Sequence, residues 1–129
     1  MHALLPALIR DAAARAPGAP AVVMDGATLA YGALDAAANR FARALHAHGV
    51  RRGDRVALWL PKSPEAVVAL YGAMRAGAAY VPVDPLAPPA RLAALVRDCE
   101  AAALVSTSDR AAALEEAFGA RAPMRALWF

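Results

Sequence analysis

The spacing of apolar residues predicts two amphipathic helices joined by a hairpin in the first part of the chain. Leu5, Leu8, Ile9 and Ala12 recur at helical spacing between Leu4 and Ala16, which predicts a helix with these residues on one side that ends at Pro17-Gly18. Two short strands are then expected at 21–24 and 27–31, because Asp-Gly between apolar runs is typical of a tight hairpin turn. A second helix follows over 32–48, with one apolar stripe, an opposite polar face and Gly49 as its stop; the stripe is Leu34, Ala38, Phe41 and Leu45, and the polar face is Asp35, Asn39, Arg43 and His46.

After Arg55 the pattern changes to continuous apolar runs alternating with helices. The run Val56–Leu60 is typical of a strand covered on both faces. Ser63-Pro64-Glu65 then has the features of a helix start: a capping side chain, a proline suited to the first turn and an acidic residue near the positive end of the helix dipole. In that helix we expect Gly72 to allow close approach to the sheet, and the inward side chains to be Val67, Leu70, Tyr71 and Met74.

The remaining elements complete an alternating pattern. Gly77 is expected to end the helix that starts after Ser63. A buried strand is expected at 78–83, with Pro82 and Asp84-Pro85 as the residues that prevent it from continuing. A stiff loop at 85–89, a helix at 90–100, a strand at 102–106, a helix at 109–118 capped by Ser108 and the opening of a strand at 124–129 follow. Alternating strands and helices predict an α/β fold with a mainly parallel sheet, flanking helices and right-handed crossovers.

The end of the chain indicates an unfinished sheet. No turn closes the apolar run that ends at Phe129, so we expect residues 1–129 to form one partial domain, with a C-terminal truncation. No internal repeat or low-complexity linker interrupts it.

Composition excludes several classes of protein. Apolar residues make up 60% of the chain, but alanine dominates them and aromatic residues are only 6%. The net charge is +3, yet the arginines are scattered without interleaved aromatic residues, which disfavours nucleic-acid binding. Arg51, Arg52 and Arg55 form the densest basic cluster, which we assign to a solvated turn.

The single cysteine and the lack of long apolar segments predict a cytoplasmic protein. Cys99 cannot form an internal disulfide, which fits a reducing compartment, and it falls on a helical stripe with Leu92, Leu95 and Val96 as a buried structural thiol. Arg10 and Asp11 interrupt the first apolar run, so no secretory leader is expected. No window approaches the roughly 18 uncharged apolar residues that a membrane span needs.

Candidate functional side chains do not converge on a chemistry. His46 and His48 are two apart on a helix and do not share a face, so surface histidines are favoured over a metal site. Arg52-Gly53-Asp54 fits a turn between helix and strand. Lys62 could meet an anion before a helix, although a solvent-facing loop residue is favoured. Asp84 could be an exposed carboxylate at a strand end, where open α/β sheets bind ligands, but Pro85 favours a turn-shaping role.

No nucleotide cradle and no catalytic triad can be assembled from these residues. A phosphate loop needs glycines that let successive amides converge on an anion, and neither G-x-G-x-x-G nor G-x-x-x-x-G-K-S/T occurs. The serines are explained as caps or strand ends: Ser63, Ser106 and Ser108. We therefore assign no catalytic, cofactor-binding or metal-binding residue.

Ordered motifs nevertheless resemble those of the AMP-forming adenylating enzymes, the superfamily of acyl-CoA synthetases and peptide-synthetase adenylation domains. Leu29–Leu34 resembles a first motif written L-S/T-Y-x-E-L, with Ala30 and Ala33 in place of the usual hydroxyl residue and glutamate. Gly53–Ala57 follows the run G-D-R-V-A, and Met74–Pro85 resembles a second motif at nearly every position. The downstream pattern continues at Pro88, Arg91, Leu92 and Asp98.

The resemblance implies the N-terminal scaffold segment of a ligase whose catalytic loops lie further along the chain. Such a ligase uses ATP and Mg²⁺ to activate a carboxylic or amino acid as an acyl-adenylate, and then transfers the acyl group to the thiol of CoA or of carrier-protein phosphopantetheine. The implied partners are the small-molecule acid and an acyl-carrier protein, and the 129-residue chain alone is expected to be inactive. Ala79–Pro82 leans toward the amino-acid branch, and the initial methionine leans toward a free-standing ligase.

Two alternatives stay open. The chain could be a non-catalytic partner or a split-enzyme half whose sheet is completed by another polypeptide. It could also be an unrelated nucleotide-binding α/β domain, which the missing glycine pattern disfavours.

Overall fold

The computed structural model describes residues 4–119 and 122–129 as a mixed α/β fold. Every element named here belongs to that described part. In chain order the elements are α1 (Leu5–Arg15), β1 (Pro20–Met24), β2 (Ala27–Ala30), α2 (Tyr31–Ala47), β3 (Arg55–Leu58), α3 (Pro64–Arg75), β4 (Ala79–Pro82), α4 (Pro89–Asp98), β5 (Ala103–Ser106), the 3₁₀ turn Ser108–Arg110, α5 (Ala111–Phe118) and β6 (Arg125–Trp128).

A four-stranded parallel sheet forms the centre of the fold. Its strand order is β4-β3-β5-β6, so β3 pairs with both β4 and β5. In register, Val56 lies opposite Tyr80 on one side and Ala103 on the other. The parallel pairing expected from alternating elements is therefore confirmed.

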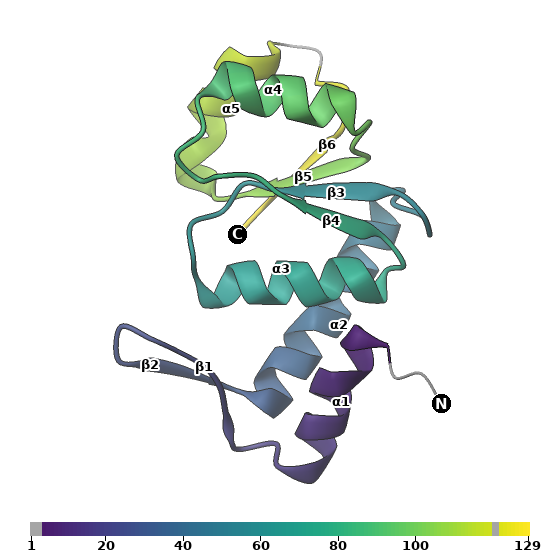
Figure 1. The fold of residues 1–129 in the computed structure, drawn as a ribbon, viewed down its shortest axis with the longest axis vertical. Helices are drawn as coiled ribbons and strands as arrows, with labels where there is room; N and C mark the ends of the chain where they lie inside the picture. Colours follow the sequence, from purple (N-terminus) through teal and green to yellow (C-terminus); the bar gives the residue numbers. More distant parts are fainter. Residues whose placement is uncertain (1–3, 120–121) are drawn as a thin grey trace.

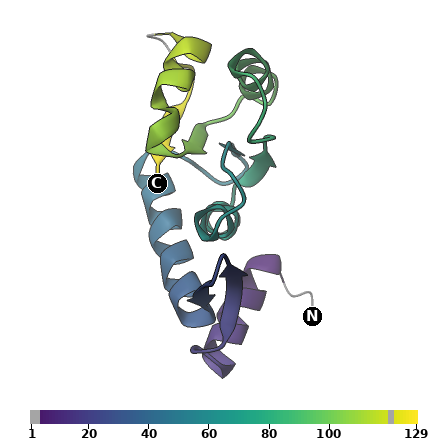
Figure 2. The ribbon, with the colours of Figure 1, turned by 90° about the vertical axis from the view of Figure 1, so that its left-hand side faces the viewer.

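Helices cover the sheet on both faces. Figure 1 shows α4 and α5 above the sheet and α3 below it, and Figure 2 shows α2 running lengthwise past α3 toward the sheet. Val56 and Leu58 of β3 belong to the cluster shared with α2 and α3, whereas Ala57 belongs to the cluster shared with α4 and α5. Because β3 is buried on both faces, its continuous apolar sequence is explained.

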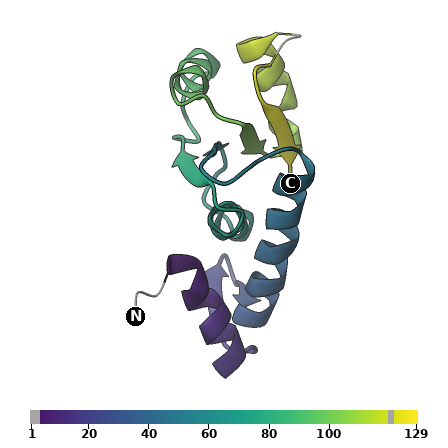
Figure 3. The same ribbon diagram turned by 90° about the vertical axis from the view of Figure 1, so that its right-hand side faces the viewer.

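Residues 4–30 form a separate layer beside α2. The predicted hairpin is confirmed: β1 and β2 pair antiparallel around Asp25-Gly26, with a register shift near Pro20. Together with α1, the hairpin packs against the first part of α2, as Figure 3 shows at the lower end of the molecule. Ile9, Leu34 and Val68 are the buried centre of this layer.

The predicted helix is confirmed as α1, and its apolar side is only partly buried. Ile9 is buried, but Leu5 is 61% exposed and Leu8 is 50% exposed. The helix packs against α2 and α3, and Ile9 is the buried residue of α1. Helical periodicity marks an apolar side of α1 that is wider than the surface it packs on.

Strand β4 differs from the prediction of a buried strand. It lies at the edge of the sheet, and Ala79, Tyr80 and Pro82 are exposed. Edge placement explains how a strand can contain Pro82, because the outer side of an edge strand needs no backbone donor. The expected stop is confirmed, since the strand ends at Pro82.

The buried face of α3 lies on the opposite side of the helix from the predicted face, because successive residues turn by about 100°. The buried residues are Val68, Ala69, Gly72 and Ala73, whereas the predicted Val67, Leu70, Tyr71 and Met74 are only half-buried. Small residues form the deepest contacts because α3 lies close to α2. The larger apolar side chains therefore lie on the half-buried side of α3, and mostly small residues form its buried side.

Gly72 faces α2 and not the sheet. A Cβ at this position would lie 2.6 Å from Cδ1 and 3.0 Å from Cβ of Phe41, and 3.2 Å from the carbonyl oxygen of Ala38. The close approach predicted for Gly72 is real, but its partner is another helix.

Of the two predicted serine caps, the one at Ser63 is confirmed and the one at Ser108 is wrong. Ser63 caps α3: its hydroxyl accepts the amide of Ala66 at 3.1 Å. Ser108 caps nothing with its side chain, because a 3₁₀ turn precedes α5, which begins at Ala111. The strand expected at 124–129 is present as β6, whereas residues 120–121 lie outside the described residues.

Gly72→Ala is expected to lower the free energy of unfolding by about 1–3 kcal/mol, because overpacking against Phe41 outweighs the gain in helix propensity of up to about 1 kcal/mol. Urea denaturation followed by circular dichroism measures the change. Gly18→Ala is the control, since a Cβ there meets nothing within 4 Å. A Gly72→Ala protein as stable as the Gly18→Ala protein would contradict the proposed close contact.

Candidate functional site

The place where an open parallel sheet normally binds a ligand lies between β3 and β5. The chain leaves β3 for β4 through α3 on one face, and returns from β4 to β5 through α4 on the other face. The carboxyl ends of β3 and β5 therefore flank the point where the crossover direction reverses, which is the common ligand position in such folds.

The chain's own groups occupy this position. The hydroxyl of Ser106 donates to the carbonyl oxygen of Trp59 at 2.9 Å, and the amide of Trp59 donates to the carbonyl oxygen of Val105 at 2.9 Å. The indole Nε1 of Trp59 donates to the carbonyl oxygen of Asp84 at 3.2 Å. Ser106 is fully buried and its hydroxyl is satisfied by the backbone, so this serine joins two strand ends.

Arg110 closes the same region from the side of the 3₁₀ turn. Its guanidinium lies 4.6 Å from the centre of the Trp59 ring, and its Nη1 donates to the carbonyl oxygen of Pro85 at 2.9 Å. A cation stacked on indole and bonded to a carbonyl is held in place. The sequence offered no signal for this pairing, because Arg110 and Trp59 are distant along the chain.

The predicted turn role of Asp84 is confirmed. Its Oδ1 accepts the amide of Leu86 at 2.9 Å, which fixes the turn after β4. Lys62, considered as an anion contact, is exposed in the loop before α3. These two residues are not brought together into a site by any contact among the described residues.

The histidines and the cysteine have structural surroundings. His46 Nδ1 lies 3.1 Å from the carbonyl oxygen of Val50, and His48 Nδ1 lies 2.8 Å from that of Ala44. Cys99 is half-buried, less than predicted, and its thiol donates to the carbonyl oxygen of Val96 at 3.7 Å. Within residues 4–119 and 122–129, no group of three His, Cys, Asp or Glu side chains could hold a metal ion.

The basic cluster is only partly a solvated turn. Arg52-Gly53-Asp54 does form a turn, in which Asp54 Oδ2 accepts the amide of Arg51 at 2.7 Å. Arg55, however, is half-buried: its Nε donates to the carbonyl oxygen of Cys99 at 2.7 Å and a terminal nitrogen lies 3.6 Å from Glu100. Arg55 therefore ties the start of β3 to the end of α4.

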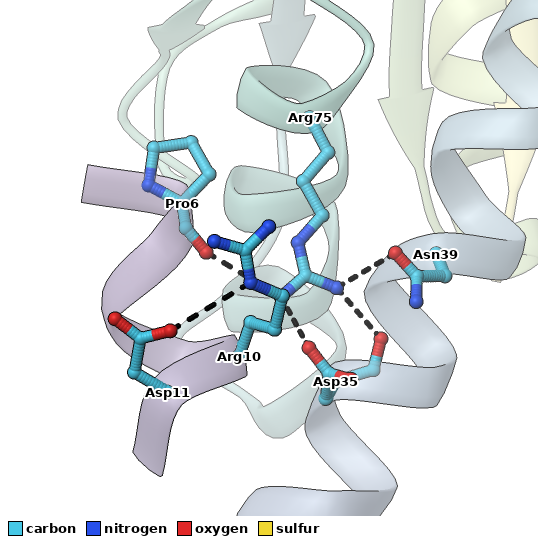
Figure 4. Close-up of polar contacts among 6 residues, drawn as sticks. All are labelled: Pro6, Arg10, Asp11, Asp35, Asn39 and Arg75. Carbon is cyan, nitrogen blue, oxygen red and sulfur yellow. Dashed lines mark hydrogen bonds and ion pairs between the residues drawn. The ribbon is translucent and has the colours of Figure 1, made fainter. Parts of the chain in front are cut away.

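The strongest polar cluster is one that the sequence did not indicate. Arg75, at the end of α3, forms an ion pair with the carboxylate of Asp35 on α2 (Figure 4). Its Nη1 also donates to the carbonyl oxygen of Asp35 at 2.8 Å and to Oδ1 of Asn39 at 2.9 Å, and its Nη2 lies 3.5 Å from the carbonyl oxygen of Pro6 on α1. The side chains of Arg75 and Asp35 are only 11% and 24% exposed.

This cluster lies on the predicted polar face of α2. Asp35 and Asn39 both accept hydrogen bonds from the guanidinium of Arg75. A shallow hollow beside the cluster is lined by Asn39, Ala42, Arg43, His46 and Arg75. Its lining contains neither a nucleophile paired with a base nor a set of metal ligands.

Comparison with known proteins decides the family. The family model described as AMP-binding enzyme matches residues 9–126. The chain belongs to the AMP-binding enzyme family. Over 90 residues it is 46% identical to surfactin synthase subunit 3 of Bacillus subtilis (strain 168), an alignment that covers 70% of this chain and 7% of that protein.

Solved structures of AMP-binding enzymes share the fold. The AMPPNP-bound form of the nonribosomal peptide synthetase FmoA3 matches with a TM-score of 0.84 and 34% identity, over 97% of this chain and 13% of that one. A benzoate CoA ligase from Burkholderia xenovorans LB400 matches with a TM-score of 0.87 and 25% identity, over 96% of this chain and 25% of that one. The chain thus spans a small part of the length of each relative.

The structure also shows how the two family-like motifs meet. Leu29–Leu34 lies at the junction of β2 and α2, directly before Asp35, and Met74–Pro85 contains Arg75 and β4. The Asp35–Arg75 ion pair therefore joins the neighbourhoods of both motifs. Among the described helices, none is long and apolar enough to cross a membrane.

Arg75→Met is expected to lower the free energy of unfolding by about 3 kcal/mol, the lower end of the range for a broken buried ion pair, because Asp35 would lose its partner while keeping some access to water. Arg75→Lys should lie between this variant and the parent, since it keeps the charge and loses the forked geometry. Chemical denaturation measures each change.

The control is Arg43→Met, which removes the same charge from an exposed position on α2. An Arg75→Met protein no less stable than the Arg43→Met protein would show that the ion pair contributes nothing.

Proposed function

We propose that this chain is the N-terminal scaffold segment of an ATP-dependent, AMP-forming ligase. The ligase activates a carboxylic or amino acid as an acyl-adenylate and transfers the acyl group to a thiol of CoA or of carrier-protein phosphopantetheine. The observation that carries the proposal is the family match over residues 9–126, together with the ordered motifs on α2, α3 and β4.

The named relatives support the finer parts of the proposal. An AMPPNP-bound synthetase supports the use of ATP, and a benzoate CoA ligase supports activation of a carboxylic acid with CoA as acceptor. Peptide synthetases among the relatives support an amino-acid substrate and an acyl-carrier protein as partner.

The described residues do not fit ATP and Mg²⁺ as a binding site of their own. They provide no cluster of metal ligands, the position between β3 and β5 is filled by Trp59, Ser106 and Arg110, and Lys62 stands in an exposed loop. In adenylate formation, bound Mg²⁺ and fixed positive groups offset the charge on the transferred phosphoryl group. We therefore derive no chemical step from this chain and assign it the support of the sheet.

In this role, the contribution of the chain is rigidity. β3 and β5 are buried on both faces, and Ser106, Arg110 and Arg75 fix strand ends and helices through bonds to backbone carbonyls. Buried and fully bonded polar groups hold one geometry. A sheet held in this way can support residues contributed by other parts of a ligase.

The intact gene product is expected to catalyse ATP–pyrophosphate exchange with at least one acid from a broad panel of carboxylic and amino acids. The 129-residue chain alone is expected to show no exchange, because its described residues lack the groups that stabilise phosphoryl charge. Formation of labelled ATP from labelled pyrophosphate measures the exchange activity of both proteins. A measurable rate from the short chain would contradict the scaffold role, and the absence of exchange by the intact product with every acid would contradict the ligase assignment.

A second candidate is a non-catalytic partner or split-enzyme half that completes its sheet with another polypeptide. The observation that favours it is the position of β6 at the edge of the sheet, paired only with β5 among the described strands. An unpaired strand edge is a template for further pairing.

Under this second candidate, the chain should co-purify with a defined partner at fixed stoichiometry. Introducing proline at Ala126 of β6 should weaken that complex if the outer edge of β6 binds the partner. The control must also lie on a strand, because proline at the exposed Ala36 would break helix α2. The matched control is therefore Tyr80→Pro on the opposite edge strand, β4. A stable monomer that binds no partner would contradict this candidate.

A further inference from the structure

The layer formed by α1 and the β1–β2 hairpin is held to the rest of the molecule by few buried contacts. We call residues 5–30 the cap. In α1, Ile9 is the buried residue, and neither hairpin strand contains a fully buried one. By contrast, all four residues of β5 are buried, as are three of the four residues of β3.

The exposed leucines show the same difference. Leu5 and Leu8 keep 61% and 50% of their surface exposed, so most of the apolar side of α1 contributes little to docking. Val23 of the hairpin is 67% exposed. Cap and sheet also have different cores: Ile9 packs with Leu34 and Val68 in a cluster distinct from the two clusters on the faces of the sheet.

A small number of polar contacts connect the cap to α2. At the start of α2, the side chain at Ala30 accepts no hydrogen bond from the helix. The amides of Tyr31 and Gly32 instead donate to the carbonyl oxygens of Ala19 and Pro17 at 3.0 and 2.9 Å. Water can replace these carbonyls when the cap moves away, because helix N-terminal amides are readily solvated. The contact from Arg75 to Pro6 is long, at 3.5 Å.

We propose that the cap opens as a unit from α2 and α3 while the four-stranded sheet stays folded. Elements with few buried apolar contacts open locally at a lower free energy than the core of the same protein. Both α2 and α3 stay in place during this opening, because Ala42, Leu45, Ala69 and Ala73 belong to the core on the sheet face. Opening uncovers an apolar surface around Leu34 and Val68.

Native-state hydrogen exchange at low denaturant concentrations tests the proposal on the 129-residue chain. Val96→Ala weakens the core on the sheet face that α4 covers, away from the cap. Amides of β5 should then exchange faster by roughly tenfold or more, while amides of α1 and the hairpin keep their parental rates, because the cap exchanges through its own opening.

Ile9→Ala provides the converse test. It should raise the exchange rates of the cap amides by roughly a hundredfold, while the amides of β5 stay protected. Leu8→Ala is the matched control: the side chain lies on the same helix but is half exposed, so its removal should leave cap exchange close to the parental rate.

Three results would overturn the proposal. The first is that Val96→Ala accelerates cap and β5 amides by the same factor. The second is that Ile9→Ala removes the protection of β5 together with that of the cap. The third is that the β5 amides of the parental chain are unprotected, because the proposal requires a sheet that stays folded when the cap is open.

Discussion

Burial of β3 and β5 on both faces is the constraint on which the rest of the structure depends. Parallel strands need crossover helices, and strands that are apolar on both faces need those helices on both sides of the sheet. The core is accordingly divided, with α2 and α3 on one face and α4 and α5 on the other. Loss of either layer would expose one side of two apolar strands.

Close packing on the α2–α3 side places a second demand on the sequence. Alanines and Gly72 allow these helices to approach, and this proximity leaves little room for a long charged side chain. Arg75 is accommodated because its guanidinium finds the carboxylate and the carbonyl of Asp35 and the amide oxygen of Asn39. A buried charge with fewer partners would be strongly destabilising.

Close packing also marks the point between β3 and β5, where parallel sheets of related architecture bind ligands. The sheet position that binds ligands in related architectures is filled by an indole, a buried hydroxyl and a guanidinium, each bonded to backbone carbonyls. These groups stabilise the strand ends through bonds to the chain's own backbone. Family membership and site chemistry are thus separate properties of this chain.

Much of the fold could be predicted from the sequence, whereas the polar cluster of Arg75, Asp35 and Asn39 could not. Ser63-Pro64-Glu65, Asp25-Gly26 and Gly77 act through bonds and backbone angles within a few residues, so their sequence alone located a helix start, a hairpin turn and a helix end. Ser108 was misassigned because the backbone there forms a 3₁₀ turn, which removes the geometry that a capping hydroxyl needs.

The sequence by itself determined the order and type of the elements and, through ordered motifs, the family. Tertiary structure alone decided which face of α3 is deepest, that β4 is an edge strand, that Leu5 and Leu8 stay exposed, and that Arg75 meets Asp35 forty residues away. The physical reason is range: turn and cap preferences are local, whereas burial and charge pairing depend on the neighbours that the folded chain brings together.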